Sequence, residues 1–173
     1  MNPIHCTHQR HAPQILDVFN EAILNSTALF DYKPRAPESM ATWFLAKAAG
    51  RFPVIGIEDL GGKLLGFASY GTFRAWPAYK YSVEHSVYVH KDHRGQGIGR
   101  ILVQELIAAA QAQDYHTLIG GIEAANTGSI ALHQSLGFTH AGTVREAGFK
   151  FGRWLDLSFF QLILQSPSSP SEA

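Results

Sequence analysis

Hydrophobic and polar residues follow one another along this chain in two periods, one typical of helices and one typical of strands. Apolar residues recur every three or four positions over residues 12–25, which predicts an amphipathic helix with Pro13 in its first turn. Short apolar runs at residues 54–57 and 64–70 flank Gly61-Gly62, and this arrangement predicts a β-hairpin.

The rest of the chain continues this alternation of strands and helices. We expect further strands at about residues 3–8, 83–90, 116–123, 138–145 and 154–164, and further helices at about 38–50, 99–112 and 127–136. This order predicts an α/β (α+β) fold, in which one mixed sheet of about seven strands carries helices on its faces. Residues 1–165 are expected to form a single domain. Residues 166–173 are polar and interrupted by proline, which predicts a disordered tail.

Composition then narrows the classes of function. Lys plus Arg and Asp plus Glu number 14 each, so charge gives no reason to expect a nucleic acid or an anionic membrane as a partner. Cys6 is the only cysteine, which excludes an intrachain disulfide and fits a reducing compartment. No signal-peptide pattern opens the chain, and no apolar stretch reaches the roughly 20 residues of a membrane helix. We therefore expect a cytoplasmic protein.

The sharpest motif is a glycine-rich turn between the strand at 83–90 and the helix at 99–112. Glycine permits positive φ and close backbone approach, and a helix start offers unpaired N–H groups with a partial positive charge. Together these features predict a site for a phosphate or pyrophosphate, with a plain strand-to-helix turn as the alternative. The turn is no dinucleotide fingerprint, because Arg100 stands where the third glycine would be, and no Gly-Lys-Ser/Thr of a P-loop occurs.

The spacing Arg94-x-x-Gly97-x-Gly99 resembles the R/Q-x-x-G-x-G/A signature of the GCN5-related N-acetyltransferase (GNAT) superfamily. Three segments, at residues 83–89, 126–138 and 148–156, resemble one subgroup, the phosphinothricin and methionine sulfoximine/sulfone N-acetyltransferases. The resemblance runs from about Ile4 to Leu164. It implies the GNAT fold, whose sheet is splayed between its fourth and fifth strands.

The resemblance also implies acetyl-CoA as co-substrate, with its pantetheine arm between the splayed strands and its pyrophosphate on the glycine turn. It assigns the following residues to the cofactor: Val87, Tyr88, Val89, Arg94, Gly95, Gln96, Gly97, Ile98, Gly99, Arg100 and Asn126. Asn126 also has the position of a helix N-cap, and the two roles are compatible.

Two residues are predicted to carry the acid–base chemistry. An amine attacks a thioester only when it is neutral, and Glu84, at the start of the splayed strand, is the candidate general base. From the residues alone, a solvated strand carboxylate is the alternative. His133 stands where many superfamily members have a tyrosine as general acid. It would either protonate the thiolate or help to deprotonate the amine.

The acceptor is expected to be a small amine that bears a carboxylate, because the guanidinium of Arg74 matches a carboxylate in a bidentate fork. By resemblance, the acceptor contacts Arg74, Ala75, Trp76, Glu84, His85 and Ser86, and its apolar walls are Phe30, Tyr32, Trp76 and Tyr79. The implied substrates are phosphinothricin, methionine sulfoximine or methionine sulfone. Two alternatives stay open: a GNAT enzyme for a protein N-terminus or a polyamine, and a non-catalytic sensor that binds coenzyme A.

Metal binding and oligomeric state complete the expectations. Neither of two groups of histidines has a metal-ligand pattern, so we expect no metal. These groups are His5, His8 and His11, and His85, His90 and His93. The long apolar strand at 154–164 is either buried on both faces or part of a dimer interface. Members of the subgroup are typically homodimers, so the resemblance implies a homodimer.

Overall fold

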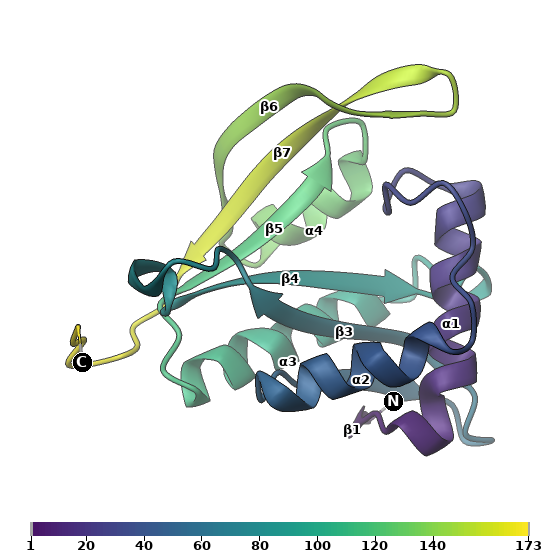
Figure 1. The fold of residues 1–173 in the computed structure, drawn as a ribbon, viewed down its shortest axis with the longest axis horizontal. Coiled ribbons are helices and arrows are strands. Elements are labelled where there is room, and N and C mark those ends of the chain that lie inside the picture. The colour runs from purple at the N-terminus through teal and green to yellow at the C-terminus, as the bar shows by residue number, and fades with distance from the viewer. Residues whose placement is uncertain (1, 173) are drawn as a thin grey trace.

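The computed structural model describes residues 2–172, which form one seven-stranded sheet with helices on both faces (Figure 1). The strands are β1 (Pro3–His5), β2 (Val54–Glu58), β3 (Leu64–Thr72), β4 (Ser82–Val89), β5 (Thr117–Glu123), β6 (Thr139–Lys150) and β7 (Arg153–Ile163). The helices are α1 (His8–Asn25), α2 (Ser39–Ala49), α3 (Ile98–Ala112) and α4 (Thr127–Ser135), with 3-10 turns at Pro77–Tyr79 and Lys91–His93. The strand order is β1-β2-β3-β4-β5-β7-β6, and β4–β5 is the parallel pair. The predicted mixed α/β fold is confirmed.

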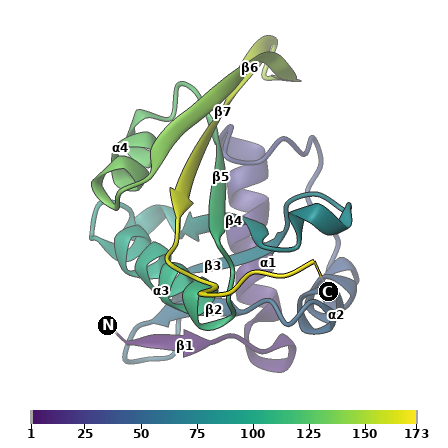
Figure 2. The same ribbon diagram turned by 90° about the vertical axis from the view of Figure 1, so that its left-hand side faces the viewer.

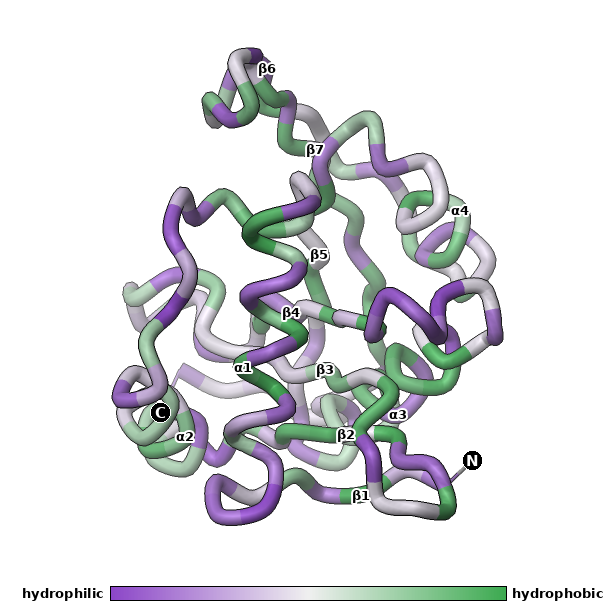
Figure 3. The backbone as a smooth tube through the Cα atoms, turned by 90° about the vertical axis from the view of Figure 1, so that its right-hand side faces the viewer, coloured by the Kyte–Doolittle hydropathy of each residue, from purple (hydrophilic) through white to green (hydrophobic). Residues whose placement is uncertain are grey.

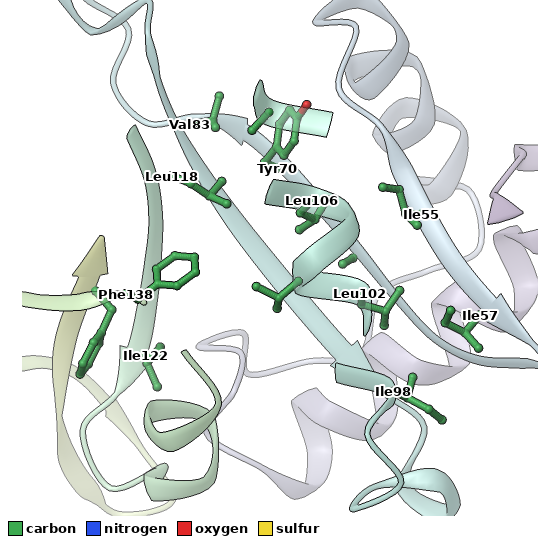
Figure 4. Packing of buried hydrophobic residues seen from close by; sticks show 14 of the residues in the cluster. Ile55, Ile57, Tyr70, Val83, Ile98, Leu102, Leu106, Leu118, Ile122 and Phe138 are labelled. Atoms are coloured by element: carbon green, nitrogen blue, oxygen red, sulfur yellow. The ribbon is translucent and has the colours of Figure 1, made fainter. Parts of the chain in front are cut away.

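Each face of the sheet has its own apolar cluster. On one face, α3 places Ile98, Leu102 and Leu106 against residues of β2 to β5 (Figure 4). On the other face, α1 packs Phe19 against Phe67 of β3. Hydrophobic and hydrophilic residues alternate along α1 (Figure 3), as its amphipathic pattern predicts. Each fully buried side chain of this kind contributes about 1.5–3 kcal/mol, which holds both helix layers on the sheet.

The sheet opens in its middle, between β4 and β5. These strands pair only from Ser82↔Thr117 to His85↔Gly120. Beyond that point β4 continues to Val89 and β5 to Glu123, and the two strands diverge (Figure 1). The expected splay between the fourth and fifth strands is therefore confirmed.

The β6–β7 hairpin is longer than predicted and extends beyond the rest of the sheet (Figure 2). The predicted strand ended at residue 145, whereas β6 continues to Lys150. Its register shifts between His140 and Gly142 and again between Val144 and Gly148. Such bulges insert unpaired residues into a strand, so a strict alternation of polar and apolar residues does not reveal its full length.

Helix α1 begins at His8, earlier than the predicted residue 12, and the first strand is correspondingly short. The ring of His11 explains the early start, because its Nδ1 accepts a hydrogen bond from the N–H of Thr7 at 2.8 Å. Pro13 consequently lies in the second turn, not in the first as predicted. The carbonyl of Gln9, which loses its helical partner to this proline, belongs to an exposed residue that water can reach.

Residues 166–172 form no helix or strand and follow the surface. Ser166 donates a hydrogen bond to the carbonyl of Tyr115, and Ser171 bonds to the hydroxyl of Tyr81. Residue 173 of the predicted tail lies outside the described residues, and the disorder of this tail stays a prediction. None of the helices in the described range is long and apolar enough to cross a membrane.

Candidate active site

A cavity of about 860 Å³ lies between the second half of β4, the glycine turn and the start of α4. Ten of the eleven residues that the sequence assigns to the cofactor line it: Val87, Tyr88, Val89, Arg94, Gly95, Gly97, Ile98, Gly99, Arg100 and Asn126. Gln96 is the exception, and its side-chain amide lies 3.5 Å from the carbonyl of Asp92. The end of β4 and the glycine turn that follows it thus meet the start of α4, about 30 residues further along the chain, at one cavity.

The glycine turn is shaped for an anion. Gly95 and Gly97 have φ values of 76° and 80°, a region that L side chains rarely adopt. A Cβ atom on either residue would meet nothing within 4 Å, so backbone conformation, not lack of space, requires glycine here. Gly97 is the N-cap of α3 and makes no side-chain cap bond, which leaves the first N–H groups of the helix for a ligand.

Arg94 is held in place beside this turn. Its Nη2 atom lies 2.6 Å from Glu21 Oε2 on α1, and its Nε donates to the carbonyl of Val89. An extended arm with a pyrophosphate group fits the whole arrangement, with the arm along the unpaired part of β4 and the anion at the N-terminus of α3. The residues present therefore fit coenzyme A.

A smaller cavity of about 80 Å³ opens where β4 and β5 separate. The two cavities share Ala28, Val87, Tyr88, Glu123, Asn126 and Ser129 as lining residues. The small cavity is also lined by His85, Ser86 and His133, and by Gly120 and Gly121 of β5. These two glycines leave room at the separation point for the rings of His85 and His133, which lie beside Gly120, and for the carboxylate of Glu84, which lies beside Gly121.

Glu84 lies on the face of the sheet that carries Ser86 and Tyr88, as its strand position predicts. Its Oε1 atom is 3.0 Å from the position that a Cβ atom on Gly121 would occupy. Burial raises the pKa of Glu84, and the nearby guanidinium of Arg74 partly lowers it. No residue in the range 2–172 donates a hydrogen bond to this carboxylate, which leaves both oxygens available to a ligand or water.

His133 lies on the opposite face, paired with His85. The two Nε2 atoms are 2.8 Å apart, and Nδ1 of His133 is 2.7 Å from the carbonyl oxygen of Ser129. Burial lowers the pKa of His133. Burial, with a smaller effect of His133, lowers the pKa of His85 to about 3. Both rings are therefore neutral near pH 7. The side chain of His85 lies beside His133, on the face of the sheet opposite to Glu84 and Ser86.

The loop that was predicted to bind the acceptor is exposed. Arg74, Ala75 and Trp76 lie outside the linings of both cavities. The guanidinium carbon of Arg74 is 4.6 Å from the centre of the Phe73 ring, and its charge acts on Glu84. Trp76 is 66% exposed and Tyr79 is 41% exposed, so neither is packed as a pocket wall in this structure.

Sequence reasoning missed Glu123, which is buried and lines both cavities. Its carboxylate accepts hydrogen bonds from the hydroxyl of Thr27 at 3.0 Å and from the N–H of Ala125 at 3.2 Å. The available signal was a charged residue at the end of an otherwise apolar strand. Glu123 ties the loop after α1 to the end of β5.

Lys150, also missed, ties the same loop to the β6–β7 hairpin. Its ammonium group, on a residue only 4% exposed, donates to the carbonyls of Ile23, Ser26 and Leu29 at 2.7, 2.9 and 2.6 Å. The ring of Phe30 covers Gly148, and the hydroxyl of Tyr32 donates to the carbonyl of Phe149. The two predicted wall residues of this loop therefore pack against the hairpin.

Within residues 2–172, no three side chains of His, Cys, Asp or Glu lie close enough together to hold a metal ion.

Comparisons with known proteins agree with this geometry. The sequence matches the acetyltransferase (GNAT) family over residues 17–138. It is 43% identical over 157 residues to an L-methionine sulfoximine/L-methionine sulfone acetyltransferase of Pseudomonas paraeruginosa, covering 91% of each chain. A solved structure of a protein from Acinetobacter baylyi superimposes with a TM-score of 0.98 at 55% identity, covering 99% of this chain and 96% of the other. A phosphinothricin acetyltransferase from Sinorhizobium meliloti in complex with AcCoA gives 0.93 at 32% identity, covering 98% and 91%.

Proposed function

The chain belongs to the acetyltransferase (GNAT) family, and on that premise we propose that it transfers the acetyl group of acetyl-CoA to the α-amine of a small amino-acid analogue. Methionine sulfoximine, methionine sulfone and phosphinothricin are the substrates proposed, because relatives that span nearly the whole chain bear these names. The observation that carries the proposal is the pair of adjoining cavities. Ten predicted cofactor residues line the larger one, and His133 lines the smaller.

Acetyl-CoA, when bound, supplies the acetyl group as a thioester. The backbone of Val87 to Val89 is proposed to hold its pantetheine arm, and the turn from Gly95 to Arg100 its pyrophosphate. Support comes from the unpaired part of β4 and from the positive φ angles at the N-terminus of α3. Asn126 already accepts a hydrogen bond from the N–H of Ser129 as the N-cap of α4. It also lines both cavities, so it can position the helix and contact the cofactor.

Glu84 is the proposed general base. The amine of an amino acid is mostly protonated at neutral pH, and Glu84 accepts this proton directly or through one water. Burial raises the pKa of the carboxylate towards the range in which a base is effective. Direct attack of the neutral amine on the thioester is proposed over a covalent enzyme intermediate. Cys6, the only thiol, is half-buried next to the edge strand β1, three strands away from β4, and burial raises its pKa to about 12.

His133 is proposed to assist the leaving sulfur from the opposite face of the gap. Arg74 is proposed to bind the substrate carboxylate, because its guanidinium is exposed and close enough to influence Glu84. A polycationic acceptor would meet repulsion from Arg74, which favours an acceptor with a carboxylate over a polyamine.

The proposal is tested by thiol release from acetyl-CoA with the purified chain and a panel of amines. The panel holds the three proposed substrates, unmodified methionine, spermidine and a peptide with a free N-terminus. We expect turnover on the first three and a loss of at least about a hundredfold in Glu84→Gln with unchanged acetyl-CoA binding. Turnover only on the peptide or on spermidine would mean that the acceptor belongs to that class of amine and not to the proposed amino-acid analogues. Tight acetyl-CoA binding without turnover on any amine would make the chain a sensor.

A homodimer in the cytoplasm is proposed as the working state. Its support is an exposed aromatic patch at the tip of the β6–β7 hairpin, where Phe149, Phe151 and Trp154 are 46%, 58% and 59% exposed. Light scattering coupled to gel filtration should give twice the 19.0 kDa mass of one chain. Replacing Phe151 and Trp154 together by serine should give the mass of a monomer.

A further inference from the structure

The paired histidines at the small cavity have a definite arrangement of protons. A carbonyl oxygen only accepts hydrogen bonds, so the 2.7 Å contact between His133 Nδ1 and the Ser129 carbonyl places a proton on Nδ1 of His133. A neutral ring carries one N–H, which leaves a lone pair on Nε2 of His133. The 2.8 Å contact between the two Nε2 atoms then requires the proton on His85.

This arrangement leaves Nδ1 of His85 as a bare nitrogen. That atom is buried and has no hydrogen-bond partner, the only side-chain nitrogen or oxygen with this property among residues 2–172. A buried polar atom without a partner lowers stability, so its presence calls for a reason. The bond from His85 to His133 supplies one, because a ring that donates through Nε2 must leave Nδ1 without a proton.

The surroundings hold both rings in this position. Phe138 contacts each of them, with ring centroids 5.3 Å from His85 and 5.0 Å from His133. Gly120 gives them room, since a Cβ atom there would lie 3.0 Å from Cε1 of His85 and 3.4 Å from Nε2 of His133. Burial is the largest cause of the lowered pKa of each ring, and no carboxylate contributes to either shift. His133 lowers the pKa of His85 further, and the backbone of Ile119 partly raises it. The pair therefore differs from a histidine oriented by a carboxylate, which favours the charged ring.

We infer that His85 is a positioning residue, which fixes His133 as a neutral ring with its proton on Nδ1. In this form the Nε2 lone pair of His133 is occupied by the N–H of His85, so His133 has no free lone pair with which to take a proton from the amine. The N–H on Nδ1 already donates to the carbonyl of Ser129, so His133 can assist the leaving sulfur only by sharing this N–H between that carbonyl and the developing negative charge, without a transfer of the proton. The inference rests on the proposed function and leaves Glu84 as the only base.

Two matched substitutions separate donation by His85 from its bulk. His85→Gln places an amide N–H near the position of Nε2, whereas His85→Leu has a similar size and no donor. Thermal unfolding of both variants establishes that they fold.

The first test observes the rings themselves, in the full chain without ligand. Long-range ¹H–¹⁵N correlation spectra report which nitrogen of each histidine carries its proton. We expect the Nδ1–H form for His133 and the Nε2–H form for His85, unchanged for His133 in His85→Gln. A wild-type His133 that carries its proton on Nε2 overturns the inference, whether or not either variant folds.

The second test is kinetic. We expect kcat to fall by about tenfold or more in His85→Leu and to stay within about threefold of wild type in His85→Gln, with the KM for acetyl-CoA nearly constant in both. Equal kcat in the two variants would contradict a positioning role. Absence of turnover in the wild-type chain would instead contradict the proposed function, and the spectra would still decide the assignment of protons.

Discussion

Gly121 offers a direct test of the position of Glu84. A Cβ atom at this residue would lie 3.0 Å from Oε1 of Glu84, 3.4 Å from Cδ1 of Leu157 and 3.7 Å from Cε1 of Phe159. The substitution Gly121→Ala therefore crowds the carboxylate and little else. The backbone of Gly121 does not have a positive φ, so alanine introduces no conformational strain.

The size of the effect follows from the geometry of proton transfer. Contacts of 3.0–3.4 Å are tighter than nearly all real Cβ contacts, so the carboxylate must retreat by a few tenths of an ångström. A general base works when it lies within about 2.6–3.2 Å of the proton-bearing atom. Moving the carboxylate by a few tenths of an ångström would take it close to the upper limit of this distance. Because a displacement of about 1 Å can cost about a hundredfold in rate, we expect a loss of about tenfold in kcat/KM, or about 1.4 kcal/mol of transition-state stabilisation.

Steady-state kinetics with methionine sulfone would measure the expected loss of kcat/KM, and urea unfolding would measure the free energy of unfolding. Gly71→Ala is the matched control, since Gly71 pairs with Glu84 from the other side and its Cβ atom would meet only Nζ of Lys47, at 3.6 Å. We expect Gly71→Ala to keep nearly full activity and Gly121→Ala to lose activity without losing stability. Equal activities in the two variants would refute the assignment of Glu84 as a positioned base.

Four further outcomes are expected from the titration of Glu84 and from the contacts of Lys150 and Gly97. Folding raises the pKa of Glu84, so the folded state binds more protons than the unfolded state. As pH falls through the raised pKa, kcat/KM should decline, and at pH 8 Glu84→Gln should unfold at a higher urea concentration than wild type. Lys150→Met, which leaves three carbonyls without their donor, should lower the unfolding free energy by about 3 kcal/mol in urea titrations. Gly97→Ala, at φ 80°, should cost about 1–2 kcal/mol of stability and weaken acetyl-CoA binding at least about tenfold by calorimetry.

Local patterns in the sequence predicted the elements of the fold well. The boundaries of α2, α3, α4 and β5 lie within one residue of expectation, because apolar periodicity and the glycine turn act over a few neighbouring positions. The start of α1 was wrong because a histidine ring replaced the usual capping side chain. The length of β6 was wrong because two register shifts interrupt its alternation.

Contacts between distant segments were harder to foresee. The motif predicted the lining of the large cavity, since the turn itself positions those residues. The pairing of His85 with His133 joins residues 48 apart, and Lys150 reaches carbonyls more than 120 residues away. Neither contact produces a characteristic spacing of residues in the sequence. His85 was therefore expected to contact the acceptor, and no structural role was predicted for Lys150.

The separation of β4 and β5 has a consequence for the solubility of the chain. A strand that lacks a neighbour can pair with any extended peptide, which makes open sheet edges a common cause of aggregation. Here two such edges face each other inside one molecule, and the four residue pairs from Ser82 to His85 keep the gap narrow. The chain can thus offer strand-like pairing to a slender ligand while excluding the strands of other proteins from the same gap.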